Sequence, residues 1–121
     1  MTTSRELIDG ALTTELLQRG IKLPAAASPS LAWIASDALS VLDELETAGV
    51  LVCGGDVWHR DPDGKITPAY ANWYYEKTTE QVSKGDVRAA ASQARSYITS
   101  LPPRNDRIVL FEIVCCGRSS P

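Results

Sequence analysis

A β-hairpin expected between residues 50 and 75 constrains the fold more than any other feature of the chain. Residues 50–59 and 65–75 both read as strands, and residues 61–64 between them are Asp-Pro-Asp-Gly. Proline pre-sets φ at the first central position of a tight turn, Asp suits the second, and Gly accepts a positive φ. Because an isolated hairpin is only marginally stable in water, we expect this one to belong to a larger sheet.

The turn also predicts which residues face one another across the hairpin. In the register that it favours, Trp58 lies near Pro68 and Asp56 lies near Tyr70. The glycine pair at residues 54–55 interrupts the first strand, and glycines inside a strand are typical of a bulge or of a close approach of another backbone.

A third strand is expected over residues 107–115, where only Glu112 interrupts an apolar run. Such a run is typical of a central strand that is covered on both faces. Residues 21–35 are harder to interpret. They read either as a connector or as a segment with a short helical turn that begins at Ser28-Pro29 and runs through Trp33.

Apolar residues recur with helical spacing in three other segments, at residues 4–19, 36–48 and 87–101. Thr3 and Glu6 have the spacing of a capping box at the start of the first helix. We expect Asp86 to cap the last helix, which Pro102-Pro103 ends.

The order of these elements is helix, helix, strand, strand, helix, strand. We therefore predict an α+β fold in which three helices pack on a three-stranded, mainly antiparallel sheet. The chain has 121 residues and no linker or internal repeat. Residues 1–121 are accordingly expected to form a single domain.

The composition excludes several classes of function. Twelve Lys and Arg against fifteen Asp and Glu give a net charge of -3, whereas a general binder of nucleic acid or of anionic membranes needs a basic surface. The longest apolar runs are far shorter than the ~20 residues of a membrane helix. The polar start of the chain has no signal-peptide core, so we expect a cytoplasmic protein with neither nucleic acid nor membrane as partner.

The cysteines predict no metal site and no disulfide framework. Cys53, Cys115 and Cys116 are odd in number, contain no CxxC spacing, and are accompanied by a single histidine, His59. This usage fits a reducing compartment. We read Cys53 and Cys115 as small core residues at the ends of strands.

Candidate catalytic groups are few. Asp56, His59 and Glu76 include ligand types for a catalytic metal, but Asp56 and His59 are three residues apart on a strand and therefore face opposite sides. Neither a phosphate-binding loop nor a hydrolase motif occurs. We therefore expect a protein that is not an enzyme and has no catalytic residues, no metal and no cofactor.

The charges are unevenly distributed along the chain. Residues 36–63 contain seven acids and one base, whereas residues 84–118 contain six bases and three acids. One interpretation is a solvated surface that happens to segregate. The other is that the second helix and the hairpin present a negative face to a basic protein partner, of which a nuclease-like toxin is an example.

Aromatic residues gather on the hairpin, which holds five of the eight in the chain: Trp58, Tyr70, Trp73, Tyr74 and Tyr75. Trp73 and Tyr75 share one face of the strand and Tyr74 takes the other. One set is expected to fill the core. The other set is either covered as well or exposed as anchors for a protein interface.

Two short motifs suggest a family. Gly-Gly-Asp-Val at residues 54–57 and Asn-Trp-Tyr at residues 72–74, within residues 36–114, resemble the immunity protein 40 family of bacterial polymorphic toxin systems. The resemblance implies a small cytoplasmic protein that binds a cognate toxin stoichiometrically and occludes it. It implies no catalytic residues.

The predicted partner-binding residues lie on the second helix and the hairpin. They are Asp43, Glu44, Asp56, Trp58, His59, Asp61, Asp63, Tyr75 and Glu76. The alternative function is that of a small enzyme or small-molecule-binding protein with a pocket near Asp56 and Glu76. A third, weaker alternative is a structural protein of a larger assembly. The sequence leaves open whether the protein is a monomer or a homodimer.

Overall fold

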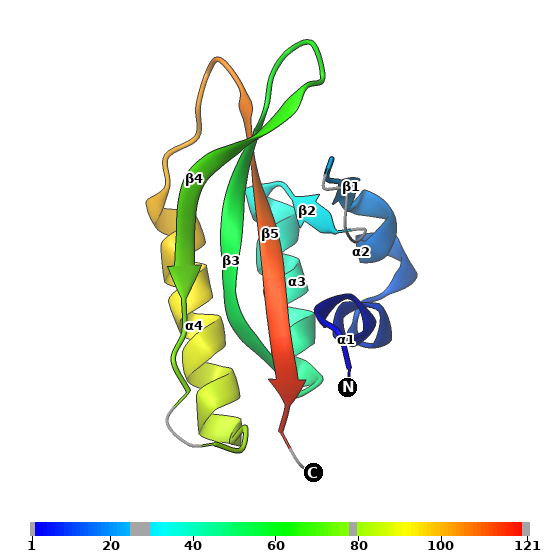
Figure 1. Ribbon diagram of the computed structural model, residues 1–121, viewed down its shortest axis with the longest axis vertical. Helices are drawn as coiled ribbons and strands as arrows, with labels where there is room; N and C mark the ends of the chain where they lie inside the picture. The colour runs from blue at the N-terminus through cyan, green and yellow to red at the C-terminus, as the bar shows by residue number, and fades with distance from the viewer. Residues whose placement is uncertain (1, 25–29, 78–79, 120–121) are drawn as a thin grey trace.

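The computed structural model describes residues 2–24, 30–77 and 80–119. A five-stranded antiparallel sheet has the strand order β1-β2-β5-β3-β4, and α3 and α4 cover one of its faces (Figure 1). The strands are β1 (Ile21–Lys22), β2 (Leu31–Trp33), β3 (Val50–Arg60), β4 (Ile66–Tyr74) and β5 (Ile108–Arg118). The helices are α1 (Ser4–Ala11), α2 (Thr14–Arg19), α3 (Ala35–Thr47) and α4 (Lys84–Ser100). None of these helices has the length and apolar character needed to cross a membrane.

The α+β composition agrees with the prediction, but three helices on a three-stranded sheet is wrong. The described residues form four helices and five strands. The expected first helix is two, because Leu12 leaves the helical conformation and Thr13 caps a new one by accepting a hydrogen bond from the backbone N–H of Leu16. A cap of this kind satisfies an N–H that the first turn leaves free.

The two additional strands come from the segment that the sequence left open. β1 and β2 pair with each other, and β2 pairs with β5 through Ala32 and Trp33. Trp33 therefore belongs to a strand and not to a helical turn, while the predicted start of that turn at Ser28-Pro29 lies outside the described residues. The indole N–H of the buried Trp33 donates to the carbonyl of Leu16 at 2.9 Å, which attaches α2 to the sheet.

The other two helices lie close to the expected positions. α3 buries the predicted stripe, which consists of Ala38, Val41, Leu42 and Leu45. α4 begins earlier than expected, because Ser83 is its N-cap and Asp86 is the third helical residue of a capping box. Ser83 and Asp86 each accept a hydrogen bond from the other's backbone N–H. Asp86 therefore belongs to the N-terminal capping box of α4, as its position suggested, but Ser83 and not Asp86 is the N-cap residue.

The register of the hairpin is as predicted next to the turn and differs beyond it. Trp58 faces Pro68, as expected, but Asp56 faces Asn72 and not Tyr70. A β-bulge between these pairs places extra residues in β4, and Tyr70 takes a φ of 57° there. Bulges bend a strand and redirect side chains. The bulge therefore moves Tyr70 out of the expected pairing.

The sheet has one covered face and one largely open face. Phe111, Ile113 and Cys115 of β5 belong to the main core together with α3 and α4 residues, while the alternate residue Glu112 points to the other side. β5 is the middle strand of the sheet, as expected, but it is not covered on both faces, because Glu112 and Val114 are only half-buried on the open side. On its second face, Leu110 is covered by a small cluster that includes Leu23 and Trp58.

Candidate functional site

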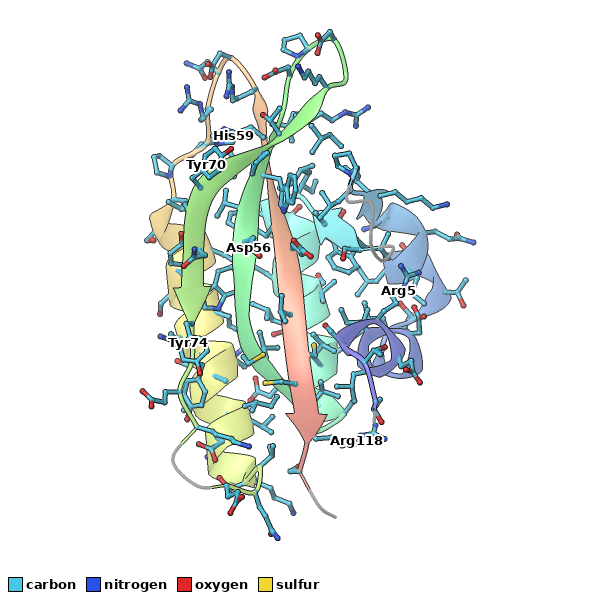
Figure 2. All side chains as sticks on the ribbon, in the orientation of Figure 1. Arg5, Asp56, His59, Tyr70, Tyr74 and Arg118 are labelled. Atoms are coloured by element: carbon cyan, nitrogen blue, oxygen red, sulfur yellow. The ribbon has the colours of Figure 1, made fainter. Side chains whose placement is uncertain are left out.

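The open face is the side of β3, β4 and β5 that lies opposite α3 and α4. Figure 2 shows Asp56 near its centre on β3, with Tyr70 and Tyr74 towards the two ends of β4. Tyr70 is 91% exposed and Tyr74 is 71% exposed, which is unusual for aromatic side chains on a sheet. The buried Trp73 between them packs on Tyr97 of α4, with ring centroids 5.0 Å apart. The alternation of the strand thus sends one aromatic into the core and the next into solvent.

The bulge holds Tyr70 away from the sheet. A positive φ is uncommon in a residue with a side chain and is a local strain that the surroundings must enforce. Such residues cluster at functional sites. The conformation of Tyr70 therefore favours a role for its exposed ring.

The glycine pair explains how the open face is shaped. A Cβ on Gly54 would collide with the carbonyl oxygen of Trp73, and a Cβ on Gly55 would collide with the Trp73 ring. Neither position tolerates a side chain, so β3 lies very close to its neighbouring strands here. A hollow of about 310 Å³ lies beside Gly54 on the open face. We call it the Gly54 hollow. It is lined by Cys53, Gly54, Gly55, Asp56, Asn72, Trp73, Tyr74 and Val114.

Two carboxylates lie side by side on the open face. Asp56 of β3 and Glu112 of β5 are direct cross-strand partners. The indole N–H of Trp58 donates to Glu112 Oε1 at 3.0 Å and orients that carboxylate. Like charges directly opposite each other destabilise a sheet. This pairing of two acids therefore gives the sheet no stabilising cross-strand contact.

Asp43 and Glu44, the two predicted site residues on α3, have partners within the protein. Arg95 Nη2 lies 2.7 Å from Asp43 Oδ1, which joins α4 to α3, and the two carboxylates that contact Arg95 raise its pKa. Glu44 Oε1 accepts the backbone N–H of Thr13 at 2.9 Å. Both carboxylates therefore hold helices together on the covered side of the sheet.

The acids at the tip of the hairpin also have internal partners. Asp61 Oδ1 lies 3.4 Å from Arg107 Nε, and Asp63 Oδ1 accepts the backbone N–H of Lys65 at 3.0 Å. His59 Nδ1 lies 3.2 Å from Arg107 Nη1. Burial lowers the pKa of His59, and the positive charges of Arg107 and Arg104 lower it further. These contacts fix the tip of the hairpin to the start of β5.

The structure brings Tyr75 into the fold and leaves Tyr74 outside it. The Tyr75 hydroxyl donates to Asp86 Oδ1 at 2.8 Å, and Asp86 is only 2% exposed. Glu76 follows in an exposed position beyond β4. The residues predicted from the sequence include Tyr75 but not the exposed Tyr70, Asn72 and Tyr74. The alternation of residues 73–75 along the strand, which places Tyr74 on the face opposite Trp73, was the signal that could have indicated Tyr74.

The cysteines are free. Cys115 is buried, as predicted, and Cys53 is half-buried. Burial is the main cause that raises the pKa of each of these thiols to about 12. A thiolate is the nucleophilic form of cysteine. Both side chains are consequently unreactive near neutral pH.

The pocket expected near Asp56 and Glu76 is present in part. Asp56 lines the Gly54 hollow, but Glu76 does not. Asp56 and His59 take opposite sides of β3, as their spacing predicted: Asp56 is aligned with Glu112 on the open face, and His59 lines a depression with Leu101 at the end of α4. Among the described residues, no three His, Cys, Asp or Glu side chains are grouped so that they could hold a metal ion.

A family profile matches most of the chain. The sequence profile of the family described as Immunity protein 40 matches residues 18–115. The match confirms the resemblance seen in the sequence and extends it over the end of α2 and over β1 and β2. Searches of curated proteins and of solved structures found no match.

Proposed function

Because the chain belongs to the immunity protein 40 family, we propose that it neutralises a cognate bacterial toxin in the cytoplasm by binding it in a one-to-one complex. Neutralisation of this kind covers a surface of the toxin and needs no chemistry in the immunity protein.

The open face is the proposed docking surface. The observation that supports it most directly is the exposure of Tyr70 and Tyr74 on a sheet face that no helix covers. Tyrosine is a preferred anchor of protein interfaces, because it offers a large rigid contact area and a polar end. Asp56, Trp58 and Asn72 lie on the same face and complete the surface.

The remaining predicted residues have a smaller part in this proposal. Asp61 and Asp63 at the hairpin tip and Glu76 beyond β4 lie at the two ends of the surface, where they form a polar rim. Asp43 and Glu44 belong to α3 on the covered side, so a partner on the open face would not reach them. The acids of the rim favour a basic toxin surface, as in a nuclease.

Co-expression with the toxin domain from the adjacent reading frame tests the proposal. We expect the wild-type protein to co-purify with the toxin in a 1:1 ratio by light scattering and to rescue growth. A Tyr70→Ala/Tyr74→Ala double variant should lose both properties while keeping its circular dichroism spectrum.

A matched control changes the exposed surface of α4, which lies on the other side. Arg88→Ala/Ser96→Ala removes two exposed side chains there and should leave binding and rescue unchanged. The proposed function is wrong if the wild-type protein neither binds nor rescues. The docking surface is wrong if the α4 variant fails and the tyrosine variant does not.

A further inference from the structure

The Gly54 hollow is a built feature of the open face. It lies beside Gly54, where β3 comes so close to β4 that a Cβ on Gly54 would collide with the Trp73 carbonyl oxygen. Its volume of about 310 Å³ is at the low end of the range of about 300–1,000 Å³ for small-molecule pockets. A hollow of this size on an exposed sheet fits one long side chain of a partner better than a metabolite.

The charge at the hollow is negative and uncompensated. Asp56 lines it, and Glu112 adds a second carboxylate directly across from Asp56 on β5. Within the part of the chain that the structure describes, the Asp56 carboxylate has neither an ion pair nor a hydrogen bond. Asp43 and Asp61 differ in this respect, because each has an arginine of the chain as partner. A cation supplied from outside would meet one carboxylate without an internal partner and a second acid on the neighbouring strand.

The other walls of the hollow suit a planar cation on an apolar stem. Tyr74 borders it with a mostly exposed aromatic side chain, and Val114 gives it an apolar wall. A guanidinium stacks on an aromatic ring and binds a carboxylate through two parallel hydrogen bonds, whereas an ammonium does neither as well. The amide oxygen of Asn72, which faces Asp56 across the strands, is a further acceptor for the same group.

We propose that the Gly54 hollow binds one arginine side chain of the toxin, with the guanidinium at Asp56 and the stem against Tyr74. This inference rests on the proposed function and names the chemistry of the partner at one point of the docking surface.

A titration without the toxin tests the hollow itself. The ¹⁵N-labelled protein is titrated with N-acetyl-arginine amide and, separately, with the neutral isostere N-acetyl-citrulline amide, while amide chemical shifts are followed. We expect saturable shifts at Gly54, Asp56 and Asn72 with the arginine compound, and at least fivefold weaker binding of the citrulline compound. The Asp56→Asn variant should bind the arginine compound at least fivefold more weakly than the wild type.

The control for this variant is Asp9→Asn, which makes the same chemical change at an exposed position on α1, outside the proposed docking surface. It keeps an oxygen that can accept from Arg5 Nε and should bind the arginine compound like the wild type. Absence of saturable shifts at the hollow, equal binding of the citrulline compound, or equal binding of an N-acetyl-lysine amide would overturn the proposal.

Affinity measurements on the complex separate this inference from the proposed function. Asp56→Asn should weaken binding of the toxin domain from the adjacent reading frame tenfold or more and reduce its salt dependence, while Asp9→Asn stays within twofold of the wild type. If the wild-type protein binds the toxin and Asp56→Asn binds equally well, the arginine site is wrong and the proposed function stands. If no complex forms at all, the proposed function fails with that toxin, and the titration alone decides the arginine site.

Discussion

The two faces of the sheet use the same residue types for opposite purposes. On the covered side, Trp33 is fully buried and its indole N–H has a partner, and the Asp43 carboxylate is paired with Arg95. On the open side, Tyr74 is exposed and Asp56 lies opposite another acid. On the covered side, the indole N–H of Trp33 has a partner, as buried polar groups usually do, whereas the indole N–H of the buried Trp73 has none among the described residues. The open face keeps Asp56 and two aromatic rings exposed, which is typical of a surface that a partner covers.

The comparison separates stability from function residue by residue. Side chains of the covered face should matter for folding whether or not a toxin is present. Side chains of the open face should matter little for folding and strongly for binding. Each of the following experiments tests this separation.

The largest expected effect is on the covered face. Trp33→Ala removes a fully buried ring and its hydrogen bond to Leu16, and large aromatic truncations in cores cost about 3–5 kcal/mol. Tyr74→Ala on the open face should change the free energy of unfolding by less than about 0.5 kcal/mol, since its side chain is mostly exposed. Urea unfolding of both variants measures the difference, and similar losses for the two would contradict the separation.

The next effect distinguishes two adjacent tyrosines. Tyr75→Phe removes the hydroxyl that donates to the buried Asp86, which should lower stability because the carboxylate then lacks one of its hydrogen-bond donors. Tyr74→Phe is the matched control, because the Tyr74 hydroxyl lies on an exposed side chain and its loss should leave stability unchanged. Thermal unfolding of the pair gives the result. The assignment of Tyr75 to the fold would be wrong if both variants melted together with the wild type.

A smaller effect of opposite sign is expected at the bulge. Glycine accepts the φ of 57° that Tyr70 adopts, so Tyr70→Gly should stabilise the protein by about 1 kcal/mol while weakening toxin binding. Tyr70→Ala keeps a Cβ and the same strain, and should weaken binding without the gain in stability. Urea unfolding and toxin affinity are both measured for Tyr70→Gly. If Tyr70 had only a structural role, the variant would not show higher stability together with lower affinity.

The sequence predicted the parts of the fold that depend on neighbouring residues. The Asp61–Gly64 turn, the Thr3 capping box and the buried stripe of α3 are local patterns, and the structure has all three. β1 and β2 are two and three residues long, so they show no measurable alternation. The bulge at Tyr70 escaped prediction as well, since a tyrosine gives no local signal for a positive φ.

The candidate site was predictable only in part, because charge in a sequence does not reveal its partner. Asp43 and Arg95 are 52 residues apart and meet only when α3 packs on α4. Asp61 is paired with Arg107 in the same way. The sequence placed Asp56 on the hairpin correctly. It did not show that the residue opposite Asp56 is another acid, Glu112, which is 56 positions later in the chain. The family, in contrast, was recognisable from the short motifs around Gly54 and Trp73, and the profile match confirms it.

The smallest expected effect concerns pH and the covered side of the hairpin tip. Burial and the positive charges of Arg107 and Arg104 lower the pKa of His59 in the folded protein, while the negative charges of Asp61 and Asp106 act in the opposite direction. In the unfolded chain, the pKa returns to its ordinary value of 6.5. The unfolded state therefore binds more protons than the folded state at acidic pH, so the contribution of His59 is present above about pH 6.5 and is lost as the pH falls below it.

His59→Gln removes this titration, and the loss of unfolding free energy between pH 7.5 and 5.5 should be smaller in the variant than in the wild type. Solvent screening keeps the difference below about 1 kcal/mol. Asp56 of the open face makes no contact with His59, so Asp56→Asn should leave this difference between pH 7.5 and 5.5 unchanged. A change as large as that of His59→Gln would show that the two faces are coupled.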